Sequence, residues 1–253
     1  MKRRWMTVLA AAWMAAAAMA QTQVVAHRGY WDCPGSAQNS IAALVKSHEI
    51  GVYGSEFDVS ITSDGVPVVN HDDDIQGHVI ETTPYSVIKD LKLKNGETLP
   101  TLDEYLKKGK ECQPTQMVLE IKPHKLTRNE NRAVAAVVAL VKKYGMEKQV
   151  DYISFSYNIC EKLVQAVKGE SPVYYLNGEI PPKGLKERGL AGLDYEFKVV
   201  HQHPEWITEA RKLGLKTNVW TVNKKADLQW LIDHKVDFIT TNKPVELQEM
   251  LKK

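Results

Sequence analysis

Residues 54–65 read GSEFDVSITSDG, an alternation that is typical of a β-strand ending in a turn. Successive side chains on a strand point to opposite faces. The apolar face carries Phe57, Val59 and Ile61, and the polar face carries Glu56, Asp58 and Ser60. An apolar face is ordinary for a strand that packs on a core, but two neighbouring carboxylates on the other face repel each other unless something neutralises them. The stretch by itself predicts a strand with two carboxylates on one face, and the role of these carboxylates depends on the residues that the rest of the chain brings to them.

Further strands of this kind alternate with amphipathic helical segments along the chain. Eight segments read as strands: 24–29, 54–62 with a short extension at 66–72, 116–123, 151–156, 171–177, 192–198, 216–223 and 237–241. Most are followed by a helical segment, which implies a parallel sheet, and eight such units imply closure into a (β/α)8 TIM barrel. An open doubly wound sheet is the alternative. No glycine-rich phosphate loop follows any of these strands, so the sequence gives no support for nucleotide binding.

The chain begins with features of a secretory signal peptide. Three basic residues precede an apolar run from Trp5 to Ala20, which ends in Ala18-Met19-Ala20 before Gln21. A single membrane anchor is the rival interpretation, because the run is only a little shorter than a spanning helix of about 20 residues. We expect residues 1–20 to be removed, a periplasmic or secreted location, no stable membrane insertion afterwards, and one barrel domain over residues 21–253 with an insertion at about 73–115.

Charge and cysteine content narrow the possible partners. Without the leader's three basic residues, 30 Lys and Arg remain against 31 Asp and Glu, and no basic cluster suggests a nucleic-acid surface. We therefore expect a small-molecule partner and no nucleic acid. Cys33, Cys112 and Cys160 are too few and too widely spaced for a disulfide framework or a zinc site, which leaves one bridge or three free thiols.

The titratable residues gather where the predicted strands end. In a TIM barrel the functional groups lie at the carboxyl ends of the strands. Residues i and i+2 of a strand lie about 7 Å apart on one face, and a neighbouring strand about 4.8 Å away brings Glu120 toward Glu56 and Asp58. Three carboxylate ligands suit a hard cation such as Mg²⁺ or Ca²⁺. The alternative is a structural network in which these acids pair with Arg28 and Lys122.

Two histidines complete the predicted site. His27 ends the first strand and His71 ends the extension of the second. With an unperturbed pKa near 6.5, one imidazole can act as a base while the other acts as an acid. Arg28 can grip phosphate oxygens in bidentate fashion and Lys122 can act as a point charge. A metal, an anion clamp and an acid/base pair together indicate cleavage of a phosphodiester.

Four segments resemble the glycerophosphodiester phosphodiesterase family over essentially the whole mature chain: AHRG (26–29), SEFDVSITSDGVPVVNHD (55–72), VLEIK (118–122) and NVWTVN (218–223). The resemblance implies a (β/α)8 barrel that uses a divalent cation to hydrolyse glycerophosphodiesters to an alcohol and sn-glycerol 3-phosphate. It assigns His27 and His71 to catalysis, Glu56, Asp58 and Glu120 to the metal, Arg28 and Lys122 to the phosphate, and Trp220 to the wall against the substrate. The segment 73–115 would be the small insertion that the family carries over the barrel mouth.

Two departures from the family pattern affect loops near this site. Ala37-Gln38-Asn39-Ser40 replaces Pro-Glu-Asn-Thr, which leaves the orientation of Arg28 open, and Thr241-Asn242-Lys243-Pro244 replaces Thr-Asp-x-Pro. Rival activities are a phospholipase-type or cell-wall glycerophosphate-polymer phosphodiesterase, and a non-catalytic barrel that binds phosphorylated ligands. The sequence leaves open the head group, the choice of Mg²⁺ or Ca²⁺, the roles of the two histidines, and the oligomeric state.

Overall fold

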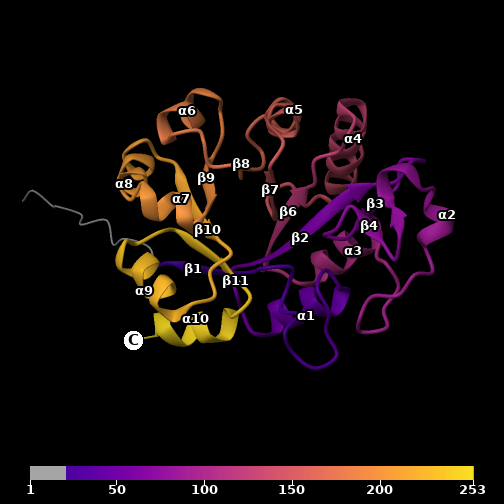
Figure 1. Ribbon diagram of the computed structural model, residues 1–253, viewed down its shortest axis with the longest axis horizontal. Coiled ribbons are helices and arrows are strands. Elements are labelled where there is room, and N and C mark those ends of the chain that lie inside the picture. Colours follow the sequence, from indigo (N-terminus) through magenta and orange to yellow (C-terminus); the bar gives the residue numbers. More distant parts are fainter. Residues whose placement is uncertain (1–20, 253) are drawn as a thin grey trace, which may run out of the picture.

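The computed structural model describes residues 21–252, and the predicted signal peptide lies outside the described residues (Figure 1). Eight parallel strands form a closed ring in chain order. They are β1 (Gln23–Ala26), β2 (Gly54–Ile61), β6 (Gln116–Ile121), β7 (Val150–Ser154), β8 (Val173–Tyr175), β9 (Gly192–Glu196), β10 (Lys216–Trp220) and β11 (Phe238–Thr241). Because β1 pairs with both β2 and β11, the predicted barrel is confirmed and the open sheet is excluded.

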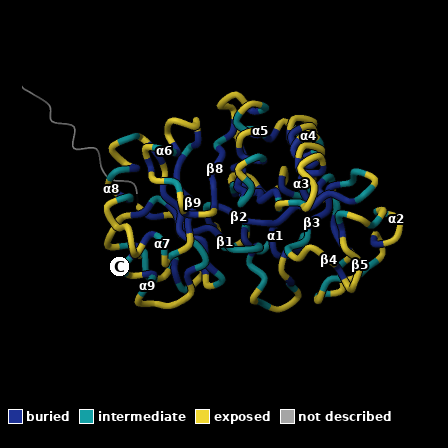
Figure 2. Tube along the Cα trace, turned by 45° about the horizontal axis from the view of Figure 1, so that its top comes forward, coloured by how far each residue is buried: buried dark blue, intermediate teal, exposed yellow. Residues whose placement is uncertain are grey.

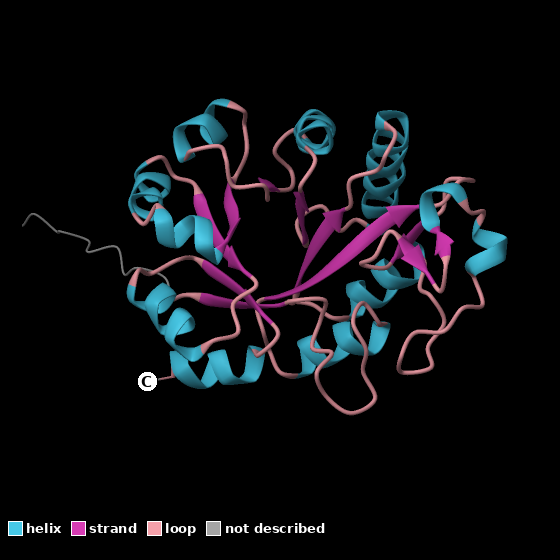
Figure 3. Cartoon of the chain, viewed as in Figure 1, coloured by secondary structure: helices cyan, strands magenta, loops and turns pink. Residues whose placement is uncertain are grey.

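Helices surround the strands on the outside (Figure 3). They are α1 (Ile41–Glu49), α3 (Leu102–Glu111), α4 (Thr127–Tyr144), α5 (Tyr157–Val167), α6 (Pro182–Glu187), α7 (Phe197–Gln202), α8 (Glu205–Lys212), α9 (Lys225–Asp233) and α10 (Pro244–Leu251). The largest apolar cluster lies between this layer and the strands, and a smaller one, which includes Val25, Val118 and Tyr174, fills the inside of the barrel. Figure 2 shows the buried strands at the centre, enclosed by partly exposed helices.

A small unit extends from the barrel between β2 and α3. The chain turns at Ser63-Asp64-Gly65 and returns as β3 (Pro67–Val69), which pairs antiparallel with β2. The hairpin of β4 (Asp74–Ile75) and β5 (His78–Val79), a 3-10 turn (Ile80–Thr82) and α2 (Tyr85–Ile88) follow. Their apolar side chains, with Val68 and Leu99, form a separate core. Helix α3 falls within the predicted insertion but packs against α1 and α4 as part of the outer ring.

The sequence pattern predicts that the first helix begins near Ser36, and that another spans 129–145 with Asn129 as its cap and Gly145 as its stop. Both predicted starts were wrong. The first helix begins at Ile41, not near Ser36, because the Ser40 side chain caps it by accepting a hydrogen bond from the Ala43 backbone N–H. Helix α4 begins at Thr127, and Asn129 is not its cap, because the Asn129 amide donates to Glu81 of the insertion. Gly145 ends α4 in the left-handed conformation, as predicted.

Two further observations concern the whole described chain. Cys33, Cys112 and Cys160 are all unpaired, which decides between the two alternatives for the thiols. Within residues 21–252, no helix combines the length and the apolar character needed to cross a bilayer.

The turn after β1 depends on a glycine that α1 packs against. Gly29 has φ +75° and a Cβ there would lie 2.6 Å from the Cβ of Ala43, whereas Gly35 has the same φ and open space around it. We expect Gly35→Ala to lower the free energy of unfolding by about 1 kcal/mol, the cost of a left-handed alanine. Gly29→Ala adds a steric clash and should cost roughly 3 kcal/mol in total.

Thermal unfolding of both variants beside the unaltered protein measures this difference, with Gly35→Ala as the matched control. Equal melting temperatures for the two variants would contradict the close approach between Gly29 and α1.

Candidate functional site

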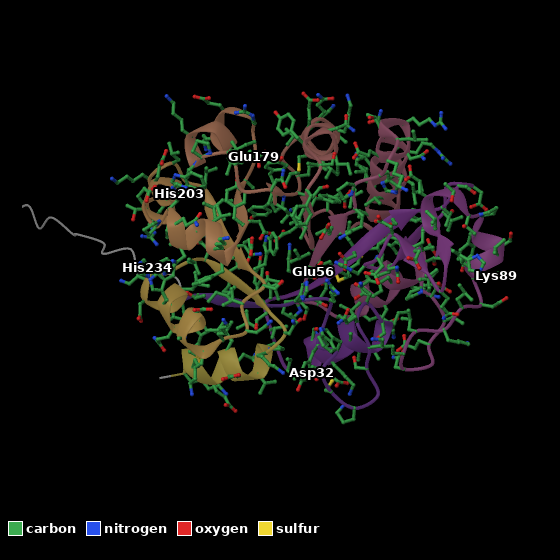
Figure 4. All side chains as sticks on the ribbon, in the orientation of Figure 1. Asp32, Glu56, Lys89, Glu179, His203 and His234 are labelled. Carbon is green, nitrogen blue, oxygen red and sulfur yellow. The ribbon has the colours of Figure 1, made fainter. Side chains whose placement is uncertain are left out.

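The predicted site residues all face one cavity at the carboxyl ends of the strands. The register pairs Ala26 with Ser55, so that His27 adjoins Glu56, and it pairs Asp58 with Glu120. Figure 4 shows Glu56 in the middle of the molecule, whereas Lys89 and His234 lie at its periphery. The cavity has a volume of about 140 Å³. All eight residues predicted from the sequence line it: His27, Arg28, Glu56, Asp58, His71, Glu120, Lys122 and Trp220.

A strained turn after β1 points a backbone N–H group toward the carboxylates. Arg28 adopts φ +57°, which is uncommon for a residue other than glycine, and Gly29 continues the left-handed turn. In this conformation the Arg28 backbone N–H donates to Glu56 Oε2 at 2.7 Å. The side chain then runs back so that Nη1 donates to Gln38 Oε1 at 2.7 Å, while Nε lies 3.9 Å from Asp58 Oδ2. Gln38 thus orients Arg28 in the position where the family usually has an acid.

Glu56, Asp58 and Glu120 form a buried acidic cluster. One carboxylate oxygen from each lies within 4.8 Å of the others. The exposed fractions of the three residues are only 3%, 1% and 6%, so water screens their repulsion poorly. Asn39 fixes Asp58 from both sides, because its Nδ2 donates to Asp58 Oδ2 and its Oδ1 accepts from the Asp58 backbone N–H. The cluster is therefore held in place by the fold despite its mutual repulsion.

The pKa values of the three acids reflect this crowding. Burial, followed by the charges of Asp58 and Glu120, raises the pKa of Glu56 well above its usual range. Burial and the charge of Asp58 raise the pKa of Glu120 to about 8. Burial also acts to raise the pKa of Asp58, but the nearby charge of Lys122 and further favourable contacts outweigh it and lower the pKa. Glu56 and Glu120 are therefore held toward their neutral forms, because the cationic side chains of the site do not balance three negative charges.

A divalent cation fits this arrangement. The donors are oxygens only, they converge, and their summed charge exceeds that of the one lysine between them. Lys122 Nζ lies 3.0 Å from Glu120 Oε1 and 3.4 Å from Asp58 Oδ1, so the expected structural pairing is present in part. Within residues 21–252, Glu56 has no salt bridge to a lysine or arginine side chain, and the imidazole Nε2 of His27 lies 4.0 Å from Glu56 Oε2. The site thus combines the two arrangements that the sequence offered as alternatives: carboxylates that converge as a cation would require, and ion pairs between these carboxylates and Lys122.

The hydrogen bonds of His27 determine its tautomer. His27 Nδ1 lies 2.8 Å from Asn242 Oδ1, and the indole N–H of Trp31, which can only donate, reaches the same oxygen. Asn242 Oδ1 is thus the acceptor, Nδ1 carries the proton, and Nε2 faces Glu56 with a free lone pair. Burial and the charge of Arg28 lower the pKa of His27 to about 4, which keeps the ring neutral. His27 is therefore arranged as a proton acceptor.

His71 occupies a different position. It follows β3, its Nδ1 lies 2.7 Å from Asp72 Oδ1, and its side chain is more exposed than that of His27. It lines the acidic cavity and also a second, larger cavity of about 780 Å³ between the loop after β1 and the insertion. The wall of this second cavity includes Trp31, Gln38, Lys92 and Lys94. His71 thus stands at the junction of the two spaces.

The opposite wall of the acidic cavity is mostly apolar. Ile153, Phe155, Leu176 and Trp220 line it, and the indole N–H of Trp220 donates to the backbone oxygen of Asp194 at 2.9 Å. Phe155 packs edge-on against Trp220 with ring centroids 5.4 Å apart. The wall therefore presents a fixed apolar surface to the acids and bases across the cavity.

Four residues at the site were missed by the sequence analysis as contributors: Gln38, Asn39, Asn242 and Asp194. Gln38 and Asn242 are two of the positions that depart from the family pattern, each with an amide where the family usually has an acid, so these departures were the signal. Asp194 alternates with Glu196 on one strand, as Glu56 does with Asp58, and the same periodicity could have identified it. His124, which follows Lys122 closely in the sequence, instead accepts a hydrogen bond from the Ile61 backbone outside this cavity.

Cation binding should be visible as a change in stability. A ligand that binds only the folded state at 100 times its Kd stabilises it by about 2.7 kcal/mol, or roughly 5–10 °C for a domain of this size. We expect Mg²⁺ or Ca²⁺ to raise the melting temperature to this extent and a chelator to reverse the rise.

Glu120→Gln provides the control for this measurement. Because the pKa of Glu120 is raised by burial and by its acidic neighbour, the neutral isostere should be at least as stable as the unaltered protein in chelator. It should also lose most of the cation-induced rise. An undiminished rise in Glu120→Gln would show that the cation binds elsewhere.

Comparison with known proteins agrees with this geometry. A model of the glycerophosphoryl diester phosphodiesterase family matches residues 27–246. A curated glycerophosphodiester phosphodiesterase from Caldanaerobacter subterraneus subsp. tengcongensis is 26% identical over 251 residues, which cover 92% of this chain and 99% of the relative.

Two solved structures of phosphodiesterases are also similar to this chain. A glycerophosphodiester phosphodiesterase from Parabacteroides distasonis is 46% identical with a TM-score of 0.90, over 92% of this chain and 97% of that one. A phosphodiesterase from Oleispira antarctica, in complex with the product sn-glycerol-3-phosphate, is 26% identical with a TM-score of 0.78, over 92% and 98% of the two chains. The chain therefore belongs to the glycerophosphoryl diester phosphodiesterase family and is a phosphodiesterase.

Proposed function

We propose that this chain is an exported, divalent-cation-dependent enzyme that hydrolyses glycerophosphodiesters to an alcohol and sn-glycerol 3-phosphate. The observation that carries the proposal is the buried cluster of Glu56, Asp58 and Glu120 beside His27 and Arg28 in one cavity. The Oleispira antarctica relative, whose structure holds sn-glycerol-3-phosphate, supports the same product here. Either Mg²⁺ or Ca²⁺ suits the three oxygen donors.

Glu56, Asp58 and Glu120 would hold the cation, which when bound polarises a phosphate oxygen and the attacking hydroxyl. Arg28 and Lys122 would bind the phosphate. The Arg28 Nε is buried and has no hydrogen-bond partner within residues 21–252, so that it remains available to a phosphate oxygen. Lys122 brings its ammonium to the same side of the cavity. The two cations would balance the negative charge that grows on the phosphate oxygens as the bond to the leaving group breaks.

The two histidines would divide the proton transfers. His27 has its proton on Nδ1 and a free lone pair on Nε2, which suits removal of a proton from the nucleophile, either water or the glycerol's own 2-hydroxyl. His71 borders both cavities, which suits donation of a proton to the departing alkoxide. The glycerophosphate part of the substrate would then occupy the smaller cavity and the alcohol the larger.

The size of the second cavity bears on the choice of alcohol. At about 780 Å³ it exceeds what a small amino alcohol requires, and its wall carries both acidic and basic side chains, among them Asp74 and Lys94. This supports tolerance of several head groups. It also keeps a glycerophosphate polymer as a second candidate substrate for the same site.

The test is release of sn-glycerol 3-phosphate from glycerophosphocholine, with and without a chelator. We expect turnover with Mg²⁺ or Ca²⁺ and none in the chelator. His27→Ala and His71→Ala should each lower kcat about 10²- to 10⁴-fold, the usual contribution of a general acid or base. No release from glycerophosphocholine, from glycerophosphoethanolamine or from a glycerophosphate polymer would refute the activity.

A p-nitrophenyl ester of glycerol phosphate separates the two roles, because its leaving group needs no proton. His71→Ala should recover most of the lost rate on this ester, whereas His27→Ala should not. Recovery in the His27 variant alone would reverse the assignment.

Export is proposed from the basic start and the apolar run before Gln21. When the full-length chain is expressed in a bacterium, we expect the protein recovered from the periplasm or medium to begin at Gln21. The intact mass of the purified protein measures this. A mass that includes residues 1–20 would support the membrane anchor instead.

A further inference from the structure

The apolar wall of the acidic cavity contains one polar side chain that no step above uses. Asp194 lies on β9, is 1% exposed, and lines the cavity together with Leu176 and Trp220. In the ring order of the barrel, β9 stands four strands from β2, which carries Glu56 and Asp58. Asp194 is therefore across the cavity from the acidic cluster.

Asp194 has an unsatisfied carboxyl oxygen. Its Oδ1 is buried and has no hydrogen-bond partner within the part of the chain that the structure describes. The nearest polar side chain in the register is Asn218, which contacts the Asp194 carboxyl and also bonds to Thr240 at 2.9 Å, yet Oδ1 stays without a partner. A buried carboxyl oxygen without a partner is costly, so stability alone does not explain why Oδ1 lies in this wall.

The space inside the barrel next to Asp194 leaves little room for a water molecule that could bond to Oδ1. The void on the inner side of Asp194, within the barrel, is only about 10 Å³. That is no larger than the smallest space that holds one water molecule, about 10–15 Å³. The larger space beside Asp194 is the acidic cavity, so a partner for Oδ1 is best supplied from there.

We propose that Asp194 binds the terminal hydroxyl of the substrate's glycerol moiety. The inference rests on the proposed function, which puts the phosphate near Arg28 and Lys122 on the other side of the cavity. In a cavity of about 140 Å³ a glycerol phosphate held there must extend toward the apolar wall, with its terminal hydroxyl farthest from phosphorus. Asp194 is the acidic side chain on that wall, and a carboxyl bonds a hydroxyl as acceptor when ionised and as donor or acceptor when protonated.

Such a contact would make the enzyme specific for glycerol. A site built to bond a hydroxyl rejects an analogue that lacks it, since the buried polar group is then left unpaired. The apolar neighbours Phe155 and Trp220 would accept the carbon chain but give no such discrimination. Asp194 thus acts as a specificity-determining residue that contacts the substrate.

The test compares glycerophosphocholine with its analogue lacking the terminal hydroxyl, 2-hydroxypropyl phosphocholine. For Asp194→Ala we expect kcat/KM on glycerophosphocholine to fall about 10- to 100-fold, the effect of one lost hydrogen bond to a charged group, with little change on the analogue. Asp194→Asn, which keeps a hydrogen-bonding group, should retain part of the preference. Asp194→Asn keeps a group that can bond to Asn218 and should not melt below the unaltered protein.

Asp151 provides a matched control, since it is also buried inside the barrel but both of its carboxyl oxygens have protein partners. Its carboxylate accepts from Gln116 at 2.9 Å and lies 3.4 Å from the Tyr53 hydroxyl. Asp151→Asn should lower the melting temperature and leave the preference between the two substrates intact.

Equal losses on both substrates, or a lowered melting temperature with an unchanged preference, would overturn the role of Asp194. Calorimetric binding of sn-glycerol 3-phosphate and of its analogue without the terminal hydroxyl tests the contact independently of turnover. Preferential binding of the former that Asp194→Ala abolishes would support it, and equal binding of the two by the unaltered protein would refute it. Absence of turnover on both diesters would count against the proposed function alone.

Discussion

The structure depends on the enforced proximity of three buried carboxylates. Glu56 and Asp58 share one face of β2, and the register with β6 adds Glu120. Mutual repulsion would drive such groups apart in a flexible chain. The closed barrel prevents this, because moving any one of them would break strand pairing on both sides. A rigid scaffold therefore maintains an unfavourable electrostatic arrangement that a bound cation would relieve.

The surrounding residues are explained by the same constraint. The left-handed turn at Arg28 brings a backbone N–H to Glu56, and Asn39 clamps Asp58 with two hydrogen bonds. These neutral donors orient the carboxylates without cancelling their charge, whereas Lys122 cancels only part of it. The site keeps enough negative charge for a divalent cation and enough positive charge on Arg28 and Lys122 for a phosphate. Orientation and charge balance are thus supplied by different side chains.

The sequence predicted the parts of this arrangement that follow from periodicity. The alternation along residues 54–65 and the positions where parallel strands end were enough to predict that Glu56, Asp58 and Glu120 lie together, because strand geometry is regular. It did not predict that Asn242 would orient His27, since the two lie 215 residues apart and meet only when β11 pairs with β1. The start of α4 was misplaced for a similar reason: the distant Glu81 binds Asn129. Contacts between irregular loops follow no periodic pattern in the sequence, so periodicity could not predict them.

The pairing of β1 with β11 has a consequence for biogenesis. All three carboxylates have been synthesised once the chain reaches Glu120, yet His27 gains its partner Asn242 only when the last strand closes the ring. A partly made chain would thus carry the three proposed cation ligands before His27 has its partner. Under the proposed mechanism, hydrolysis would therefore require the pairing of the last strand with the first.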